Sequence, residues 1–219
     1  MKGFILAAKS KSSQMFDEKK NRIPTTYLIT SPCHVIAIKQ PKVDGYMNIQ
    51  LGFGKATNKA KPQMGQLTKA GIETPLRFFR EFRLKEATII EENKKAGVQI
   101  GETKLFVGDE VKPSTFFKIG DIVAVSGTSK GKGFQGVGKR HHFKGQLRTH
   151  GYPKQRAPGS IGSTTTPGRV LKGLRMAGRM GNDRVTVFGL PVMNIDEKGM
   201  TVKGLIPGAI GGLVEVRMK

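Results

Sequence analysis

The fold of this chain is decided by a segment without aspartate or glutamate, residues 122–182, which reads IVAVSGTSKGKGFQGVGKRHHFKGQLRTHGYPKQRAPGSIGSTTTPGRVLKGLRMAGRMGN. Its 61 residues carry 12 of the 38 lysines and arginines, together with 13 glycines and three prolines. Uncompensated positive charge and thin apolar content oppose packing into a core. Unlike a low-complexity basic linker, the segment mixes aromatic residues and histidines irregularly among its charges. We therefore predict an extended loop that becomes ordered on a polyanion.

The sequence on both sides of this segment has the pattern of short strands bounded by turn residues. The strands are predicted at 26–30, 34–38, 46–53, 78–84, 121–125, 185–195, 200–205 and 213–218. Turns are predicted at 44–45 and at 197–199, the second joining two strands as a hairpin. A short helix is predicted at 62–70 and a weaker one at 85–96, each followed by glycine. Short strands on both sides of one long insertion indicate a mainly β protein with minor α, a β-barrel whose closing strands follow the insertion.

Composition narrows the class of protein. The 219 residues carry a formal net charge of +22, and only 37% of them are apolar. No stretch approaches the roughly 20 apolar residues of a membrane span, and the apolar run at 4–8 is too short for a signal peptide. The single cysteine, Cys33, excludes an internal disulfide framework. We expect a soluble intracellular protein whose polyanionic partner is nucleic acid and not a membrane.

Two glycine motifs raise the alternative of a nucleotide-binding enzyme. Residues 131–136 match G-x-G-x-x-G, but the continuation VGKRHH is poor helix and the nearest downstream carboxylate is Asp183. Residues 133–139 match G-x-x-x-x-G-K, but Arg140 stands where a serine or threonine would bind magnesium. Both matches are interpreted as coincidences in a glycine-rich segment.

The sequence gives little support for a catalytic site or a metal site. A segment without carboxylates cannot supply paired acids or the aspartate of a catalytic triad. His141 and His142 are adjacent, so their side chains diverge, and neither His150 nor the pair Cys33-His34 gives zinc-ligand spacing. We predict no enzyme, no cofactor, no metal site and no small-molecule substrate.

The segment is suited to structured RNA. Glycines let the backbone approach phosphates, and lysines and arginines spaced along an extended chain neutralise them on either side. The sequence contains no helix-turn-helix, zinc-finger or basic-helix pattern of the kind that binds DNA. It also contains no aromatic-rich strand of the kind that binds RNA on the face of a sheet. The stretch 159–168 carries no charge although charges crowd both sides of it. Small hydroxyl and glycine residues fit a tip that threads between closely packed RNA elements.

A series of motifs within the segment carries a family resemblance. In order they are GTSKGKGF at 127–134, THG at 149–151, RAPGSIG at 156–162, TPGRV at 166–170, KGLRMAGRMG at 172–181 and VT at 185–186. This series closely resembles the bacterial and organellar form of ribosomal protein three of the large subunit. Looser similarity extends over the rest of the chain. The sequence departs from the family pattern in four places. Its start reads AKSKSSQM at 8–15, Ser163 stands in place of a common glutamine, and the stretch at 86–104 is longer. Between His150 and Pro158 the chain is about one residue short and has Gln155-Arg156 where His-Arg is common.

The resemblance implies a six-stranded barrel of the type shared by translation proteins, formed by 1–126 and 183–219, with a surface insertion near 86–104. It implies that 127–182 is a loop that penetrates 23S-type rRNA, with binding near the rRNA 3′ end and an early role in subunit assembly. Partners would be this rRNA and neighbouring large-subunit proteins, in a bacterial cytoplasmic or an organellar ribosome. The predicted rRNA-binding residues are Lys130, Lys132, Lys139, Arg140, Lys144, Arg148, His150, Arg156, Arg169, Lys172, Arg175 and Arg179. The predicted tip near the peptidyl transferase centre is Ser160, Gly162, Ser163, Thr164, Thr165 and Thr166.

Overall fold

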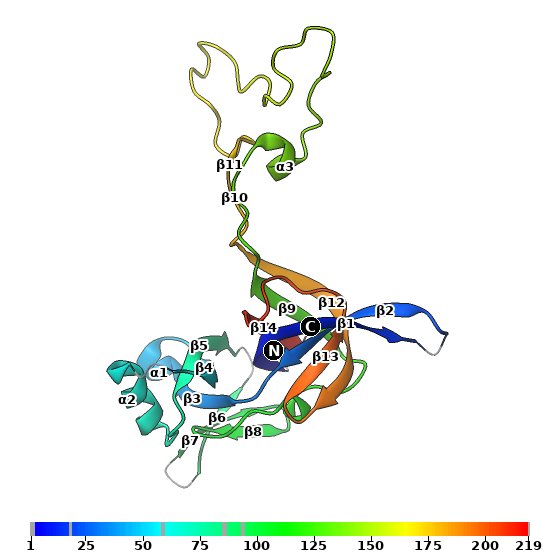
Figure 1. Cartoon of the computed structure of the whole chain (residues 1–219). Helices are drawn as coiled ribbons and strands as arrows, with labels where there is room; N and C mark the ends of the chain where they lie inside the picture. Colours follow the sequence, from blue (N-terminus) through cyan, green and yellow to red (C-terminus); the bar gives the residue numbers. More distant parts are fainter. Residues whose placement is uncertain (1–2, 18, 58–59, 85–86, 93–94, 219) are drawn as a thin grey trace. The chain divides into compact units, whose positions relative to one another are not determined.

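A computed structural model describes residues 3–17, 19–57, 60–84, 87–92 and 95–218. Within these residues the chain forms 14 β-strands, three short α-helices and one 3-10 helix, so the predicted mainly β fold with minor α is confirmed. The chain divides into two compact units (Figure 1). We call the first, Met1–Thr128 with Arg184–Lys219, the globular unit, and the second, Ser129–Asp183, the basic unit.

Six strands of the globular unit form a closed ring, in which each is hydrogen-bonded to an antiparallel neighbour on either side. Around the ring the order is β1, β14, β9, β12, β13 and β2, after which β2 pairs with β1 again. Their bounds are β1 Phe4–Phe16, β2 Arg22–Ile29, β9 Ile122–Thr128, β12 Arg184–Asp196, β13 Gly199–Lys203 and β14 Leu213–Met218. Three of these strands follow the basic unit in the chain, so the ring cannot close without them.

The beginning of β1, Phe4–Ala7, is buried on both of its faces. Ile5 lies opposite Val216 of β14, and both side chains are fully buried. On the other face, the ring of Phe4 stacks on that of Phe82 with their centroids 4.7 Å apart. A strand buried on both faces reads as a continuous apolar run. This burial explains the run at 4–8, which has no polar alternation to mark it as a strand.

A second sheet and a helix complete one side of the globular unit. The sheet contains β3 Cys33–Lys39, β4 Asn48–Lys55 and β5 Leu76–Arg83, in that order. The helices nearby in sequence are α1 Pro41–Asp44 and α2 Lys61–Lys69. Side chains of β3, β5 and the α2 region form a small core of their own, made of Ile36, Leu67, Ala70, Ile72 and Leu76. The larger core lies inside the ring and between the ring and this sheet.

A third sheet occupies the stretch where the sequence predicted a helix. It is formed by β6 Thr88–Glu92, β7 Lys95–Ile100 and β8 Thr103–Phe106, and a 3-10 helix, Pro113–Thr115, follows. The helix predicted at 85–96 is therefore wrong for its described part, and residues 85–86 and 93–94 lie outside the described residues. Val98, Ile100 and Leu105 join the main core.

The other secondary-structure predictions agree with the structure. All eight predicted strands overlap observed ones, and the hairpin predicted at 197–199 joins β12 to β13. The predicted helix at 62–70 matches α2. Gly71, just past its end, has a φ of +73° and donates its amide to the Thr68 carbonyl at 3.0 Å. Gly45, in the other predicted turn, has a φ of +78° at the end of α1.

Candidate nucleic-acid interface

The two ends of the basic unit are held together by a short antiparallel ladder. Strand β10, Gly133–Gln135, pairs with β11, Gly178–Met180. Below this pair the Lys132 amide donates to the Met180 carbonyl at 2.9 Å, and the Ser129 amide donates to the Asp183 carbonyl at 2.9 Å. The ladder brings residues about 50 positions apart in the sequence to the same place, so the intervening chain forms one closed loop.

Glycine is required where the two strands of the ladder cross. Gly181 has a φ of +75°, and a Cβ built on it would lie 2.2 Å from the Lys130 carbonyl oxygen and 3.1 Å from Gly131 Cα. These are backbone atoms, which cannot rotate out of the way. Gly178 leaves room for a neighbouring side chain, since its added Cβ would lie 2.5 Å from Arg140 Nη1. The glycines of this region therefore serve close packing in the protein as well as any approach to phosphate.

A one-turn helix follows β10, contrary to the prediction that this stretch is poor helix. Helix α3 spans Val137–His141, with Gly136 as its N-cap and His142 as its C-cap at a φ of +61°. The helix does open just after the third glycine of the G-x-G-x-x-G match. It has only five residues, and the only carboxylate of the basic unit belongs to Asp183, which lies 47 positions after Gly136. The requirement for an acidic residue to hold a ribose is still unmet.

Two side chains of α3 tie the helix to the returning chain. Arg140 Nη1 donates to the Met176 carbonyl at 2.8 Å, and His141 Nε2 lies 3.0 Å from the same oxygen. Arg140 was predicted to bind rRNA, and nothing in the sequence indicated that it also holds α3 to the returning chain. One of its five N–H donors is used inside the protein, and the others remain for a ligand.

Nearly all of the predicted RNA-binding side chains are exposed, and none of them has a counterion among the described residues. All of them except the half-buried Arg140 lie at the surface of the basic unit. No cation of the basic unit forms an ion pair with a residue that the structure describes. The surface is therefore strongly electropositive and fully hydrated, which is the arrangement that favours binding to a polyanion with release of its counterions.

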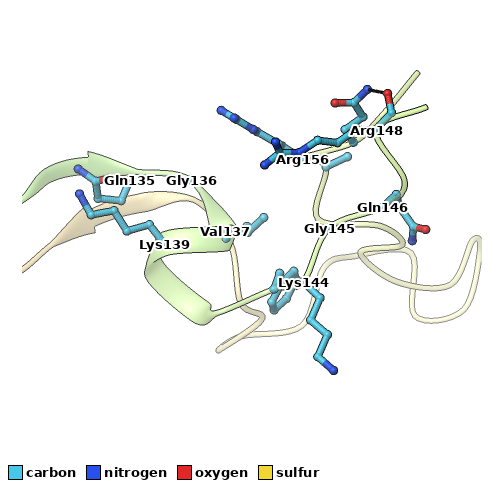
Figure 2. A pocket seen from close by; sticks show the side chains of 13 residues that line it. Gln135, Gly136, Val137, Lys139, Lys144, Gly145, Gln146, Arg148 and Arg156 are labelled. Atoms are coloured by element: carbon cyan, nitrogen blue, oxygen red, sulfur yellow. Dashed lines mark hydrogen bonds between the residues drawn. The ribbon is translucent and has the colours of Figure 1, made fainter. Parts of the chain in front are cut away.

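Four of these cations border one pocket of about 420 Å³, formed between α3 and the chain that follows it. They are Lys139, Lys144, Arg148 and Arg156. In Figure 2, Arg148 and Arg156 lie at one end of the pocket, and Lys144 points away from them. The walls are braced by the Gln155 side chain, which donates to the Arg148 carbonyl at 2.9 Å. Because the charges lie at the rim and diverge, they suit several phosphates of an extended strand better than one enclosed nucleotide.

Phe143 is a structural centre of the basic unit that sequence reasoning missed. It is half-buried and lines three pockets of this unit. One of them, of about 320 Å³, is shared with Pro158, Ile161 and Leu174, which lie far from Phe143 in the sequence. Its position directly after the end of α3 gave no signal in the sequence, because the helix itself was not predicted. The role itself depends on contacts that only the fold reveals.

The uncharged tip has almost no internal support. All residues from 156 to 175 are exposed, and no backbone amide of 159–168 donates a hydrogen bond. The only side-chain bond within the predicted tip residues runs from Ser160 Oγ to the Gly162 carbonyl at 3.3 Å. Few hydrogen bonds of the described chain therefore fix the conformation of this stretch, and its threading into RNA stays a prediction.

The described part of the chain contains no arrangement suited to binding a metal ion, crossing the membrane with a helix, or catalysis by a thiol. No group of three His, Cys, Asp or Glu side chains there could hold a metal ion. None of the helices described is long and apolar enough to cross a membrane. Cys33 is buried, and this burial raises the pKa of its thiol to about 12, so it is no candidate nucleophile at neutral pH.

Comparison with known proteins decides the family. The family model described as "Ribosomal protein L3" matches residues 64–209, which is more than half of the chain. The chain belongs to the ribosomal protein L3 family. It is 44% identical to the large ribosomal subunit protein uL3 of Cutibacterium acnes, over 97% of this chain and 90% of that protein. It is 46% identical to uL3 of Herpetosiphon aurantiacus, over 97% and 94%, and 39% identical to uL3 of Prochlorococcus marinus, over 97% and 92%.

Membership of the L3 family confirms two predictions. The resemblance inferred from the motifs at 127–186 was correct, and the proteins of this family are structural constituents of the ribosome and not enzymes. The alternative of a nucleotide-binding enzyme at 131–136 is thereby set aside. The family model spans the whole basic unit and more than half of the described globular unit.

Proposed function

We propose that this L3-family protein is a constituent of the large subunit of a bacterial ribosome, where it binds 23S-type rRNA mainly through the basic unit. The names of its relatives support the large subunit, and these relatives are bacterial. This favours the cytoplasmic ribosome over an organellar one. The observation that carries rRNA binding is the set of exposed cations of Ser129–Asp183, none paired with a described carboxylate.

The finer proposals follow the family resemblance. The ring of six strands is the translation-protein type of barrel, and the stretch at 86–104 is an insertion relative to other members. Residues 127–182 penetrate the rRNA, and the protein as a whole binds close to the 3′ end of that rRNA and helps to nucleate subunit assembly. Neighbouring large-subunit proteins complete the site. The cations named above contact phosphate or sugar, and few of them read base edges.

The salt dependence of rRNA binding tests the role of the basic unit. Neutralising Lys172, Arg175 and Arg179 with glutamine should lower the slope of log affinity against log salt by about 2.1 to 2.7, since each lost phosphate contact removes roughly 0.7 to 0.9. The matched control neutralises Lys42, Lys61 and Lys69, three exposed lysines of α1 and α2. Equal loss of slope in both triple variants would mean that binding follows net charge and not the basic unit.

The tip is proposed to lie near the peptidyl transferase centre, with Ser163 facing it. Ser163→Arg, or deletion of 164–166, should leave the globular unit folded and initial rRNA binding intact, because the tip contributes neither charge nor hydrogen-bonded structure. It should slow late subunit maturation or change sensitivity to drugs that act at that centre. Gradient profiles and drug titration of cells that carry the variant measure both. Normal maturation with an unchanged drug response would identify the tip as a passive turn.

A further inference from the structure

A polar row crosses the outer face of the ring in the globular unit. Glu215 of β14 pairs with Ser126 of β9, and Ser126 pairs with Thr186 of β12. Ser126 Oγ and Thr186 Oγ1 are 2.8 Å apart. Since side chains alternate along a strand, these residues lie on the face opposite to Val125, Val214 and Val216, which fill the interior. Arg217 and Arg184 stand two positions from members of the row and share its face.

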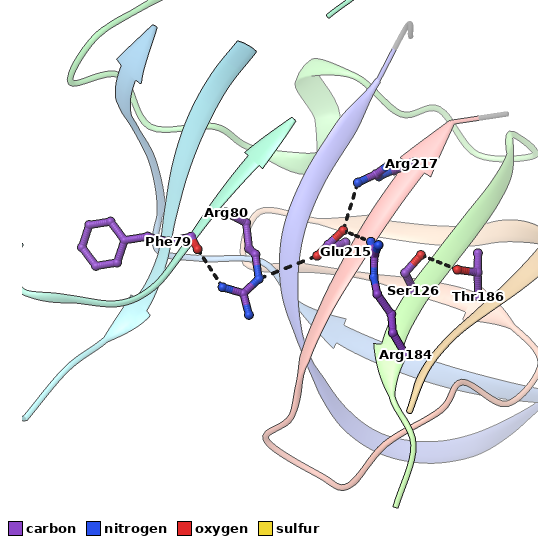
Figure 3. Close-up of polar contacts among 7 residues, drawn as sticks. All are labelled: Phe79, Arg80, Ser126, Arg184, Thr186, Glu215 and Arg217. Carbon is purple, nitrogen blue, oxygen red and sulfur yellow. Dashed lines mark hydrogen bonds and ion pairs between the residues drawn. The ribbon is translucent and has the colours of Figure 1, made fainter. Parts of the chain in front are cut away.

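Three arginines from three different strands converge on the one carboxylate of this row (Figure 3). Glu215 Oε2 lies 2.5 Å from Arg184 Nη2 and 3.1 Å from Arg217 Nη2. Its other oxygen lies 3.8 Å from Nε of Arg80, which comes from β5. The carboxylate is only 13% exposed, whereas the Arg80 and Arg184 side chains are 52% and 58% exposed. Glu215 therefore lies beneath a cluster of cations that face the solvent.

The cluster has a surplus of charge and of hydrogen-bond donors. One carboxylate cannot neutralise three guanidinium groups, so two positive charges remain close together and repel each other. The Nε of Arg217 is buried and has no hydrogen-bond partner among the residues that the structure describes. Its guanidinium also lies over the Phe82 ring, 5.2 Å from the centroid, which fixes its orientation. Arg80 Nη1 donates to the Phe79 carbonyl at 2.9 Å, which fixes a second guanidinium.

We propose that Arg80, Arg184 and Arg217, gathered by Glu215, form a phosphate-binding site for the RNA backbone on the globular unit, additional to the basic unit. The proposal rests on the proposed rRNA binding. Guanidinium forks match the oxygens of a phosphate, and an incoming phosphate supplies the negative charge that the cluster lacks. RNA is favoured over an acidic protein partner because the side chains of the site are charged or hydroxyl-bearing. The apolar centre of a typical protein interface is absent from it.

The test uses the full-length chain and a 23S-type rRNA fragment, with affinity measured over a range of salt concentrations. The double variant Arg80→Gln with Arg184→Gln should lower the slope of log affinity against log salt by about 0.7 to 0.9, the contribution of the one phosphate that the cluster binds. Both side chains are more than half exposed, so the variant should keep its fold, which the unfolding midpoint verifies. The matched control is Arg77→Gln, which removes an exposed charge from the same strand β5 and should leave the slope nearly unchanged.

A charge-preserving variant separates RNA recognition from a structural ion-pair network. Arg184→Lys keeps the charge next to Glu215 but loses the fork, so it should weaken RNA binding several-fold while leaving the unfolding midpoint in place. If the double variant matches Arg77→Gln in slope while the Lys172, Arg175 and Arg179 variant still loses slope, the cluster is no RNA site although the proposed function stands. If none of these variants changes the slope, the proposed function itself fails.

Discussion

The crossing at Gly181 gives a prediction whose size can be worked from the structure. Substituting alanine imposes two separate costs. A left-handed φ of +75° costs a residue with a Cβ about 1 to 2 kcal/mol. The contact of 2.2 Å with the Lys130 carbonyl oxygen must also be relieved by moving backbone, which costs about 1 to 3 kcal/mol, as overpacking does in a core. Gly181→Ala should therefore weaken the ladder at the base of the basic unit by about 2 to 5 kcal/mol.

Two neighbouring glycines separate these costs. Gly133 has a φ of +68° but nothing within 4 Å of an added Cβ, so Gly133→Ala should cost only the conformational part, about 1 to 2 kcal/mol. Gly131 has no left-handed φ, and its nearest neighbour would be Asn182 Cβ at 3.9 Å. Gly131→Ala should therefore be neutral or slightly stabilising, because it reduces the entropy of the unfolded chain.

Hydrogen exchange measures this series directly. The reporters are the amides of Ser129 and Lys132, which donate to Asp183 and Met180 across the ladder. At about 1.4 kcal/mol per factor of ten, Gly181→Ala should speed their exchange by at least about 25-fold. Gly133→Ala should have an intermediate effect, and Gly131→Ala none. Exchange of the ring amides should not change. Equal exchange in the Gly181 and Gly131 variants would refute the argument that the crossing requires glycine.

Three further predictions concern the free protein. Amides of 159–168 should exchange at nearly unprotected rates without RNA while the ring stays protected, because none of them donates a backbone hydrogen bond; strong protection there would contradict this. Cys33 should resist alkylation at pH 7 to 9 until the protein unfolds, since burial raises its pKa to about 12 and keeps the thiol protonated. The hydrogen bond from Lys39 chiefly lowers the pKa of Glu81, so its contribution is present at neutral pH and lost as pH falls through that lowered pKa. In Glu81→Gln the unfolding midpoint should therefore fall less steeply as the pH is lowered. An equally steep fall in the variant would show that the pair of Lys39 and Glu81 does not contribute to stability.

The mainly β fold could be predicted because most strands alternate polar and apolar residues between turn signals. The helix predicted at 85–96 failed for a local reason. Gly97 was interpreted as a helix end, but it lies in β7 against Phe106, whose ring would be 2.6 Å from an added Cβ. A glycine in a strand often marks such close packing. The β-branched residues Thr88, Ile89 and Ile90 favoured a strand. The helix was predicted instead because the stretch is long and ends in a glycine.

The candidate site could be predicted in composition but not in its internal contacts. The cations of the basic unit and its uncharged tip were identifiable one residue at a time, since charge and glycine content are local properties. Helix α3 was missed because glycine and valine are poor helix formers. Its fixation depends on the bond from Arg140 to Met176, 36 residues away. Arg184 and Arg217 are brought together by the pairing of β12 and β14 with β9, and Arg80 reaches them from the separate sheet that contains β5, so the sequence does not show that the three converge.

The division of charge between the two units gives a physical reason for an order of events. In the globular unit several cations form ion pairs with described carboxylates. Lys39 pairs with Glu81, and Arg80, Arg184 and Arg217 pair with Glu215. In the basic unit the single carboxylate, Asp183, is bound by its backbone in the ladder, and its cations have no counterpart in the protein. We therefore expect the globular unit to fold without a partner, and the basic unit to become compact only when a polyanion supplies its missing negative charge. A globular unit that folds first and still carries an unsatisfied arginine cluster can make an initial contact with RNA. That contact would raise the local concentration of phosphate around the basic unit before its long loop is ordered.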